Sequence, residues 1–234
     1  QGDTVQVTFS NGKTATATLP VTVNSGGVSN YGDTVLDTAG LQSYWRMGET
    51  AGPTFADSKG TSPATAVNGP VFGVPGAVSG DPNTAARFDG SNDYANANVN
   101  LSTTNKATVE FWLKCNAYAG DDRLAMEFTP NFNDNAGGFL VDPNAPQQGG
   151  SFGVGIGTQA SRNNVFFNRP SAGQWHHYAL VFDTSAPADQ QIIPYVDGAP
   201  VSFTKLDNGT GAGNFENSTL YMMSRAGTAL FGAG

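Results

Sequence analysis

The chain consists of short segments in which apolar and polar residues alternate, separated by clusters of Gly, Asn, Asp, Ser and Pro. Alternation with a period of two puts one face of a segment against a core and the other in water, as in a half-buried β-strand. Such segments recur at spacings of about 8–15 residues, which is typical of a sandwich or jelly roll. We therefore predict an all-β fold, a two-sheet antiparallel jelly-roll sandwich. The segments expected to form its strands are 43–48, 85–89, 92–99, 107–115, 123–128, 138–142, 151–156, 164–168, 175–183, 191–197, 200–205 and 218–224.

A β-hairpin is expected to precede the sandwich. Residues 4–9 and 14–23 alternate around Asn11-Gly12, which supplies the two positive φ angles of a type I′ turn. Two strands cannot bury a core alone, so residues 1–23 are either the tail of a preceding β domain or a hairpin docked on the sandwich itself. Residues 24–32 are expected to be a linker. The jelly-roll domain should then occupy 33–234, starting with a helical turn at 33–37.

The composition argues against several classes of protein. Nineteen acidic against eleven basic residues give a net charge of −8, and binding nucleic acid requires a basic stripe. No apolar run of about 18 residues exists, so no membrane insertion is expected. The single cysteine excludes an internal disulfide framework and a zinc–thiolate site.

The segment 107–115 shows how the core is expected to form. Val109, Phe111, Leu113 and Cys115 fall on one face and should point inward. Cys115 is then a small buried filler, not a reactive thiol. Asp197-Gly198 lies between two β segments and predicts a second hairpin turn.

The sequence does not show the patterns of a catalytic chain. Glycosidases on jelly rolls place two carboxylates on one strand face, and no such E-x-D-x-E pattern is present. A Gly-x-Ser-x-Gly nucleophile elbow is also missing. His176 and His177 are adjacent, so on a strand they point to opposite faces and cannot chelate one metal. We therefore predict that the chain is not an enzyme.

Seven segments, in order, resemble the laminin-G-like, concanavalin-type jelly-roll domains of bacterial surface, secreted and phage-structural proteins. The resemblance covers roughly residues 33–234. It implies two packed antiparallel sheets, a structural calcium, and a binding or adhesive role without catalysis. The segments are YWRMGETAG (44–52), ADSKG (56–60), GAV (76–78), FDGSNDY (88–94), ATVEFWLK (107–114), WHHYA (175–179) and YVDG (195–198).

The chain departs from this family at its end. Such domains continue into a final strand that pairs beside the first one, here 43–48, and this chain stops before it. An unpaired edge invites another strand. The place is expected to be taken by a later segment of a longer protein, by residues 1–23 or by a neighbouring chain. An unpaired edge of this kind predicts oligomerisation through strand edges or through residues 1–32.

Calcium prefers several oxygen ligands, and four acidic residues are candidates: Asp57, Glu49, Asp89 and Asp93. The alternative is that Asp57 and Asp89 accept hydrogen bonds from their own turns.

Asp134 and Asn135 match the pair that binds calcium and ligand in the related pentraxins. The later loop 224–227, however, carries a base and no acid, so an ordinary Asn/Gly-rich loop is favoured there.

Aromatic rings in loops are candidates for sugar contacts, here Tyr118 and Phe132. Trp45, Trp112 and Trp175 are expected to pack within or over the sheets.

The expected function is a non-catalytic extracellular or virion-surface module that binds carbohydrate or a surface protein. The alternative is a structural spacer or decoration domain of a phage tail or surface assembly. A glycoside hydrolase or polysaccharide lyase is disfavoured.

Overall fold

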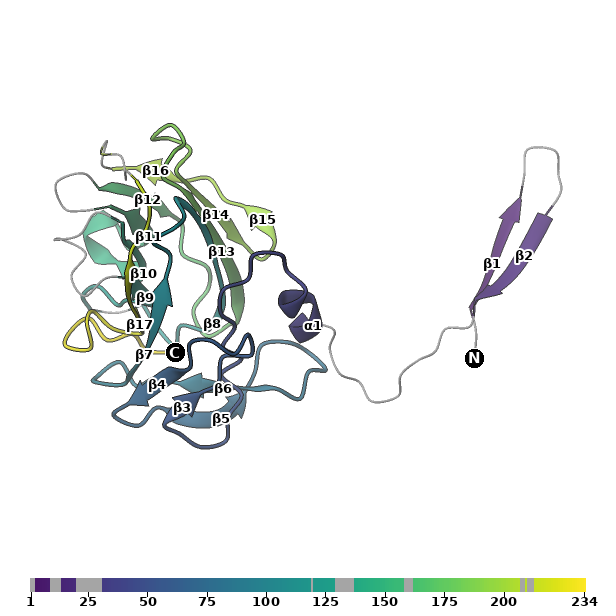
Figure 1. The fold of residues 1–234 in the computed structure, drawn as a ribbon, viewed down its shortest axis with the longest axis horizontal. Helices are drawn as coiled ribbons and strands as arrows, with labels where there is room; N and C mark the ends of the chain where they lie inside the picture. The colour runs from purple at the N-terminus through teal and green to yellow at the C-terminus, as the bar shows by residue number, and fades with distance from the viewer. Residues whose placement is uncertain are drawn as a thin grey trace.

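The computed structural model describes residues 3–8, 14–19, 31–118, 120–128, 137–157, 162–206, 209 and 213–234. Within these residues almost all regular structure is β, and the paired strands run antiparallel. Two packed sheets form the body of the domain, which confirms the predicted all-β sandwich (Figure 1).

The larger sheet contains nine strands within the described residues, in the order β16-β12-β11-β10-β9-β17-β7-β4-β3. Several neighbours in this order are distant in sequence, as in a jelly roll. The strands are β3 (Thr54–Phe55), β4 (Ala64–Val67), β7 (Tyr94–Asn100), β9 (Met126–Phe128), β10 (Phe139–Ala145), β11 (Ser151–Ile156), β12 (Asn163–Phe167), β16 (Thr204–Lys205) and β17 (Asn217–Met222).

The smaller sheet packs against the larger one and has the order β15-β14-β13-β8. Its strands are β8 (Lys106–Leu113), β13 (His176–Asp183), β14 (Ile192–Val196) and β15 (Ala199–Pro200). Two further pairs stand outside both sheets. They are β5 (Val71–Pro75) with β6 (Thr84–Arg87), and β1 (Asp3–Thr8) with β2 (Thr14–Leu19).

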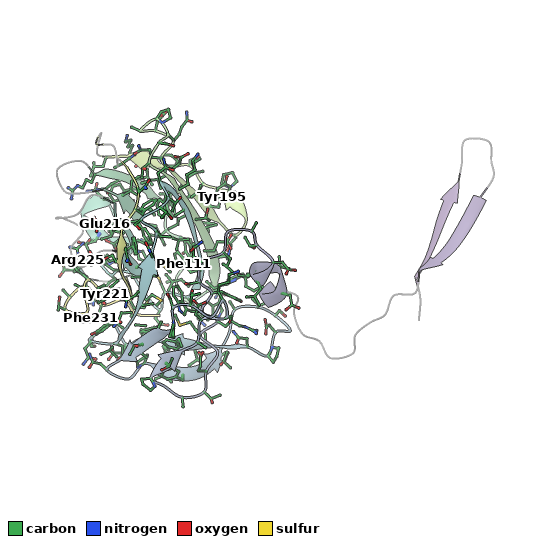
Figure 2. All side chains as sticks on the ribbon, viewed as in Figure 1. Phe111, Tyr195, Glu216, Tyr221, Arg225 and Phe231 are labelled. Carbon is green, nitrogen blue, oxygen red and sulfur yellow. The ribbon has the colours of Figure 1, made fainter. Side chains whose placement is uncertain are left out.

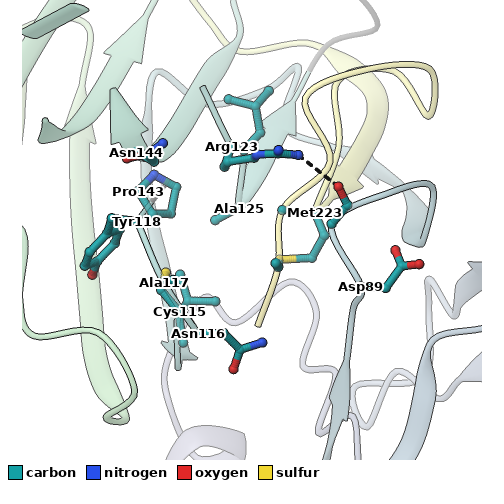
Figure 3. Close-up of a pocket in the computed structure, with 15 residues that line it drawn as sticks. Asp89, Cys115, Asn116, Ala117, Tyr118, Arg123, Ala125, Pro143, Asn144 and Met223 are labelled. Atoms are coloured by element: carbon teal, nitrogen blue, oxygen red, sulfur yellow. Dashed lines mark hydrogen bonds between the residues drawn. The ribbon is translucent and has the colours of Figure 1, made fainter. Parts of the chain in front are cut away.

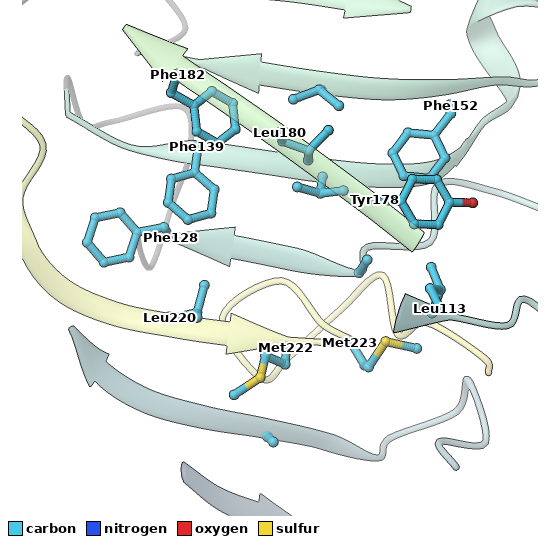
Figure 4. Packing of buried hydrophobic residues seen from close by; sticks show 14 of the residues in the cluster. Leu113, Phe128, Phe139, Phe152, Tyr178, Leu180, Phe182, Leu220, Met222 and Met223 are labelled. Carbon is cyan, nitrogen blue, oxygen red and sulfur yellow. The ribbon is translucent and has the colours of Figure 1, made fainter. Parts of the chain in front are cut away.

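The core lies between the two sheets and is rich in stacked aromatic rings (Figure 4). Phe139 on β10 stacks on Phe128 at 5.1 Å and on Phe182 at 5.2 Å, so it joins the larger sheet to β13. Phe152 on β11 stacks on Tyr178 of β13 at 4.7 Å. These rings are almost completely buried, and they hold the two layers in register.

The inward face predicted for residues 107–115 is confirmed on β8 and just after it. Leu113 and Cys115 are buried, while Val109 and Phe111 are partly buried against the core. Burial raises the pKa of the Cys115 thiol to about 11, so the side chain is an uncharged filler.

Arg225 and Phe231 of the C-terminal segment lie near Tyr221 of β17, on the larger sheet (Figure 2). Arg225 donates from Nε to Oε1 of the buried Glu127 at 3.0 Å. The ring of Tyr94 contacts those of Tyr221 and Phe231, with centroids 6.2 and 6.4 Å apart. The segment is therefore an integral part of the sandwich.

The prediction of a strand at 43–48 is wrong. Only Trp45 forms an isolated bridge there, with Asp57. Met47 has a positive φ of 57°, which interrupts an extended chain. The Asn83 side chain donates to a main-chain carbonyl of this segment, a role that a neighbouring strand would otherwise fill.

The helical turn predicted at 33–37 is the helix α1 (Tyr31–Leu36), which begins two residues earlier. Asp33 therefore lies in the first turn and not at the N-cap, and the last two residues of the expected linker are helical. Trp112 of β8 donates from Nε1 to the Tyr31 hydroxyl at 3.1 Å, which fixes α1 on the outer face of the smaller sheet. The described helices are all too short for a transmembrane span.

Two other differences concern short strands. Segments β3, β4 and β5 were not predicted, because turn residues crowd this part of the sequence. Residues 200–205 were predicted as one strand, but β15 and β16 belong to different sheets. The pairing of residues 4–9 with 14–23 is confirmed for β1 and β2, and the Asn11-Gly12 turn lies outside the described residues.

Candidate functional site

A pocket of about 220 Å³ lies where the segment after β8 meets a bulge in β10 and the C-terminal segment (Figure 3). The bulge arises from a register shift between Asp142 and Ala145. The polar side chains that line the pocket are Asp89, Cys115, Asn116, Tyr118, Arg123 and Asn144.

Tyr118 forms one wall of this pocket. The guanidinium of Arg169 lies over its ring, 4.4 Å from the centroid. Burial is the main reason that the pKa of Tyr118 is raised to about 12, and the hydroxyl also interacts with Cys115 and Tyr178. The ring of this loop residue is therefore an uncharged surface that Arg169 holds in place.

Asn144 connects three segments at the pocket. Its Nδ2 donates to the main-chain carbonyls of Gly120 at 3.4 Å and Asp121 at 2.8 Å. Its Oδ1 accepts a hydrogen bond from Arg169. The same asparagine thus holds the segment that comes after β8 and orients the guanidinium over Tyr118.

Asp142 precedes the bulge of β10 by one strand position and is buried. Burial raises its pKa to about 7, against the hydrogen bonds from the N–H groups of Asn144 and Arg123, and the neighbouring Asp122 carboxyl raises it further. A hydrogen bond between the two carboxyls also raises the pKa of Asp142, because it favours the protonated form of this side chain.

Arg123 closes the side of the pocket opposite Tyr118. Its Nη1 donates to the carbonyls of Gly90 at 2.9 Å and Phe231 at 3.0 Å, the first of which is visible in Figure 3. The guanidinium is thus used to join three segments, and Asp89 lies on the same side. The charges of Arg123 and Asp89 leave the pocket without a strong excess of either sign.

The pocket combines an aromatic ring, several hydrogen-bonding groups and small apolar residues. Pockets for drug-sized ligands measure about 300–1,000 Å³, so this one is suited to a smaller unit, such as a single ring. Apolar walls with a few fixed polar groups favour recognition of a ligand that has both apolar and hydroxyl surfaces.

Of the residues predicted to bind ligand, Tyr118 lines this pocket, and Phe132, Asp134 and Asn135 lie outside the described residues. The sequence analysis did not identify Arg123, Asn144 and Arg169. No local motif marks them, because only the folded chain brings these three segments together.

Both carboxylate oxygens of Asp57, a predicted calcium ligand, accept hydrogen bonds. Oδ1 accepts from the N–H groups of Tyr44 at 2.8 Å and Lys59 at 2.9 Å, and Oδ2 accepts from Ser62 at 2.9 Å. Thr61 donates to Oδ2 from both its N–H and its hydroxyl. Burial acts to raise the pKa of Asp57, but these bonds outweigh it and lower the pKa. The structure thus shows the turn-stabilising role considered as the alternative.

The other three predicted ligands also accept hydrogen bonds from nearby N–H groups. Oδ1 of Asp89 accepts from the N–H of Ser91 at 2.7 Å, and Asp93 accepts from the N–H of Asp89 at 3.2 Å. Glu49 accepts from the N–H of Ala56 at 2.8 Å. In the described ranges no group of three or more His, Cys, Asp or Glu is arranged to hold a metal. Main-chain N–H groups thus engage each of these four carboxylates, and the calcium ion stays a prediction.

Comparison with known families gives one match. The family described as the concanavalin A-like lectin/glucanases superfamily, of the laminin-G type, matches residues 89–231. A search of curated proteins finds no match. The matched range contains Tyr118, Arg123, Asn144 and Arg169, together with most strands of both sheets.

Proposed function

Because the chain belongs to the concanavalin A-like lectin/glucanase superfamily, we propose that it is a carbohydrate-binding module whose ligand occupies the pocket beside Tyr118. Domains of this superfamily generally bind carbohydrates or proteins. The role proposed for this pocket is recognition without chemical change of the ligand.

One observation carries this proposal: the ring of Tyr118 is fixed on the wall of a small pocket by Arg169 and Asn144. A sugar ring presents an apolar C–H face that can lie on an aromatic ring, and its hydroxyls need donors and acceptors nearby. The exposed amide of Asn116 is such a group at the rim. Because the pocket is already formed, little conformational entropy is lost on binding.

An extracellular or virion-surface location agrees with this proposal. Charged residues make up only 13% of the chain, and Gly, Asn, Ser and Thr are abundant. Contacts through neutral polar groups depend little on salt, which suits a module exposed outside a cell.

A glycan array with the purified chain tests the proposal. We expect binding to at least one glycan, loss of binding with Tyr118→Ala, and partial retention with Tyr118→Phe, which keeps the ring. Tyr195→Ala on β14 is the matched control, because Tyr195 is half-buried on the smaller sheet and does not line the pocket. If no glycan binds, or if Tyr118→Ala binds like the unmodified chain, the proposal is wrong.

A second candidate function is that of a structural module, and the open edge of β8 favours it. Within the described residues β8 pairs with β13 on one side only. Next to it lies a cavity of about 680 Å³ between the two sheets. Its apolar lining includes Trp45, Val109, Phe111, Phe128, Met222 and Met223.

A strand from a neighbouring chain could pair with the open side of β8 and fill the adjacent apolar cavity. Its main chain would pair with β8, and alternate apolar side chains would enter the cavity. Light scattering over a range of concentrations tests this assembly. We expect an oligomer that Val109→Lys dissociates and that Ile193→Lys, at an exposed position on β14, leaves intact. A monomer at every concentration would exclude self-assembly through β8.

A further inference from the structure

Three side chains at one end of the smaller sheet form a chain of hydrogen bonds. Oγ of Ser171 lies 3.3 Å from Nε2 of His176, and Nδ1 of the same ring lies 2.8 Å from Oδ2 of Asp197. Ser171 precedes β13, His176 is the first residue of β13, and Asp197 comes directly after β14. The order of hydroxyl, Nε2, Nδ1 and carboxylate is that of a serine hydrolase triad.

The carboxylate is held in place by the pairing of β13 with β14. Its Oδ1 accepts from the N–H of His177 at 2.9 Å, and the N–H of Asp197 donates to the carbonyl of His177 at 2.8 Å. The hydrogen bond with His176, and then that from His177, lowers the pKa of Asp197. An ionised carboxylate only accepts, so the neutral imidazole carries its proton on Nδ1 and leaves Nε2 free to accept one from Ser171.

We propose that Ser171 and His176, with Asp197 as positioning residue, hydrolyse esters of small carboxylic acids. Oγ of Ser171 attacks the ester carbonyl while its proton passes to Nε2 of His176. The carbon–oxygen bond to the alcohol then breaks, and the alcohol leaves with the proton from Nε2. Water attacks the acyl-serine, gives a proton to Nε2, and releases the carboxylic acid with the hydroxyl of Ser171 restored.

The main chain after Ser171 offers a donor for the negative charge that develops on the carbonyl oxygen. The N–H of Gly173 donates to the carbonyl of Cys115 at 2.7 Å, which fixes this turn. The N–H of Ala172 donates to no main-chain acceptor within the described part of the chain. The residue next to the nucleophile supplies one oxyanion donor in many serine hydrolases.

The openness of the site determines which substrates it can take. Ser171 is exposed, and the side chains of His176 and Asp197 are 17% and 52% exposed. Water is not excluded, so electrostatic stabilisation of the transition state is weaker than in a closed site. Esters with a good leaving group require the least stabilisation, and amides are not expected to react.

Ester hydrolysis at Ser171 is independent of carbohydrate binding, although the two sites are close. Arg169, which lies over Tyr118, is two residues before Ser171, and the carbonyl that holds Gly173 belongs to Cys115 of the pocket. Ester hydrolysis by this chain was not expected from the sequence, which predicted a chain that is not an enzyme. That expectation used carboxylate pairs and the nucleophile elbow, and neither pattern describes a serine brought to a histidine by a loop.

Labelling with a fluorophosphonate, and then peptide mass mapping, tests the nucleophile. We expect an adduct on Ser171 and none on Ser185, a matched exposed serine whose Oγ donates to the carboxylate of Asp183 without a histidine. With p-nitrophenyl acetate, Ser171→Ala and His176→Gln should each lower kcat/KM by about 100-fold or more.

Asp197→Asn tests the role of Asp197 in orienting the His176 ring without disrupting the fold, because Asn-Gly also favours this type of hairpin turn. We expect it to lower kcat at least about 10-fold with KM nearly unchanged and with the circular dichroism spectrum preserved. An unlabelled Ser171, or equal ester hydrolysis by the unmodified chain and Ser171→Ala, would overturn the proposal. The three side chains would then be a surface hydrogen-bond chain only.

Discussion

The guanidinium of Arg169 lies 4.4 Å from the centre of the Tyr118 ring, and this contact links two loops that are far apart in the sequence. Arg169 comes after β12, and Tyr118 comes after β8. Cation–π contacts of this kind contribute about 0.5–2 kcal/mol, depending on how far they are shielded from water. The hydrogen bond from Arg169 to Asn144 adds to this contribution and fixes the plane of the guanidinium.

Removal of this guanidinium should therefore loosen the wall of the pocket. We expect Arg169→Ala to lower the free energy of unfolding by about 1–2 kcal/mol, as measured by urea denaturation. Arg169→Lys should recover only part of this loss, because an ammonium lacks the planar fork that meets Asn144. Arg87→Ala, at an exposed position of β6, is the control and should change stability by less than about 0.5 kcal/mol. Equal effects of Arg169→Ala and Arg87→Ala would contradict this account.

The ion pair between Arg225 and Glu127 gives a second prediction. The Glu127 side chain is fully buried, whereas that of Arg225 is 30% exposed. Arg225→Ala leaves a buried carboxylate without this partner, so we expect a loss of about 3 kcal/mol in the free energy of unfolding. The control is Lys106→Ala, which removes an ion pair of 2.8 Å to Asp183 at an exposed position and should cost less than about 1 kcal/mol.

A double variant distinguishes the charge from the packing. Glu127→Gln combined with Arg225→Met removes both charges and keeps similar volumes, so it should recover much of the stability lost in Arg225→Ala. If the double variant is less stable than Arg225→Ala, the loss arises from packing of the C-terminal segment and not from the loss of this ion pair.

The buried Asp142 predicts a dependence of stability on pH. Its pKa is raised to about 7 in the folded chain, mainly by burial, whereas an unfolded Asp titrates near 4. The folded state therefore binds the proton more tightly than the unfolded state. This contribution to stability is complete below about pH 4 and is lost as the pH rises through about 7.

Asp142→Asn should remove this dependence, because an amide cannot ionise. Melting temperatures measured from pH 5 to pH 8 should fall with pH more steeply for the unmodified chain than for Asp142→Asn. Asp189→Asn, at an exposed position, controls for the change in net charge and should keep the steeper fall. Parallel curves for the unmodified chain and Asp142→Asn would show that this carboxyl is not protonated in the fold.

The sequence predicted those parts of the fold that depend on local alternation. The inward row of segment 107–115, which ends at Leu113 and Cys115, is a direct consequence of a period of two. The Asp197-Gly198 turn was also predicted, and the pairing of Val196 with Ala199 confirms it. The strand predicted at 43–48 does not form, because side chains, and not a neighbouring strand, bind the main chain of this segment.

The two proposed sites could not be predicted in this way, since each depends on register between distant segments. Tyr118, Asn144 and Arg169 meet only because a bulge in β10 faces two loops. His176 reaches Asp197 because β13 and β14 pair in one particular register, which places Asp197 beside the start of β13. Alternation shows which face of a strand is buried, but it does not show which strands become neighbours.

The last prediction tests whether Asp57 stabilises a turn or binds calcium. Both carboxylate oxygens accept hydrogen bonds from the segments 43–44 and 59–62, so Asp57 joins these two segments. Asp57→Asn should lower the free energy of unfolding by about 2 kcal/mol, since an amide nitrogen cannot accept these bonds. The loss should be the same in excess calcium and in EDTA, and calcium should not raise the melting temperature of the unmodified chain. A ligand that binds the folded state raises the melting temperature by mass action. A rise with calcium that is absent in Asp57→Asn would therefore show that Asp57 binds calcium.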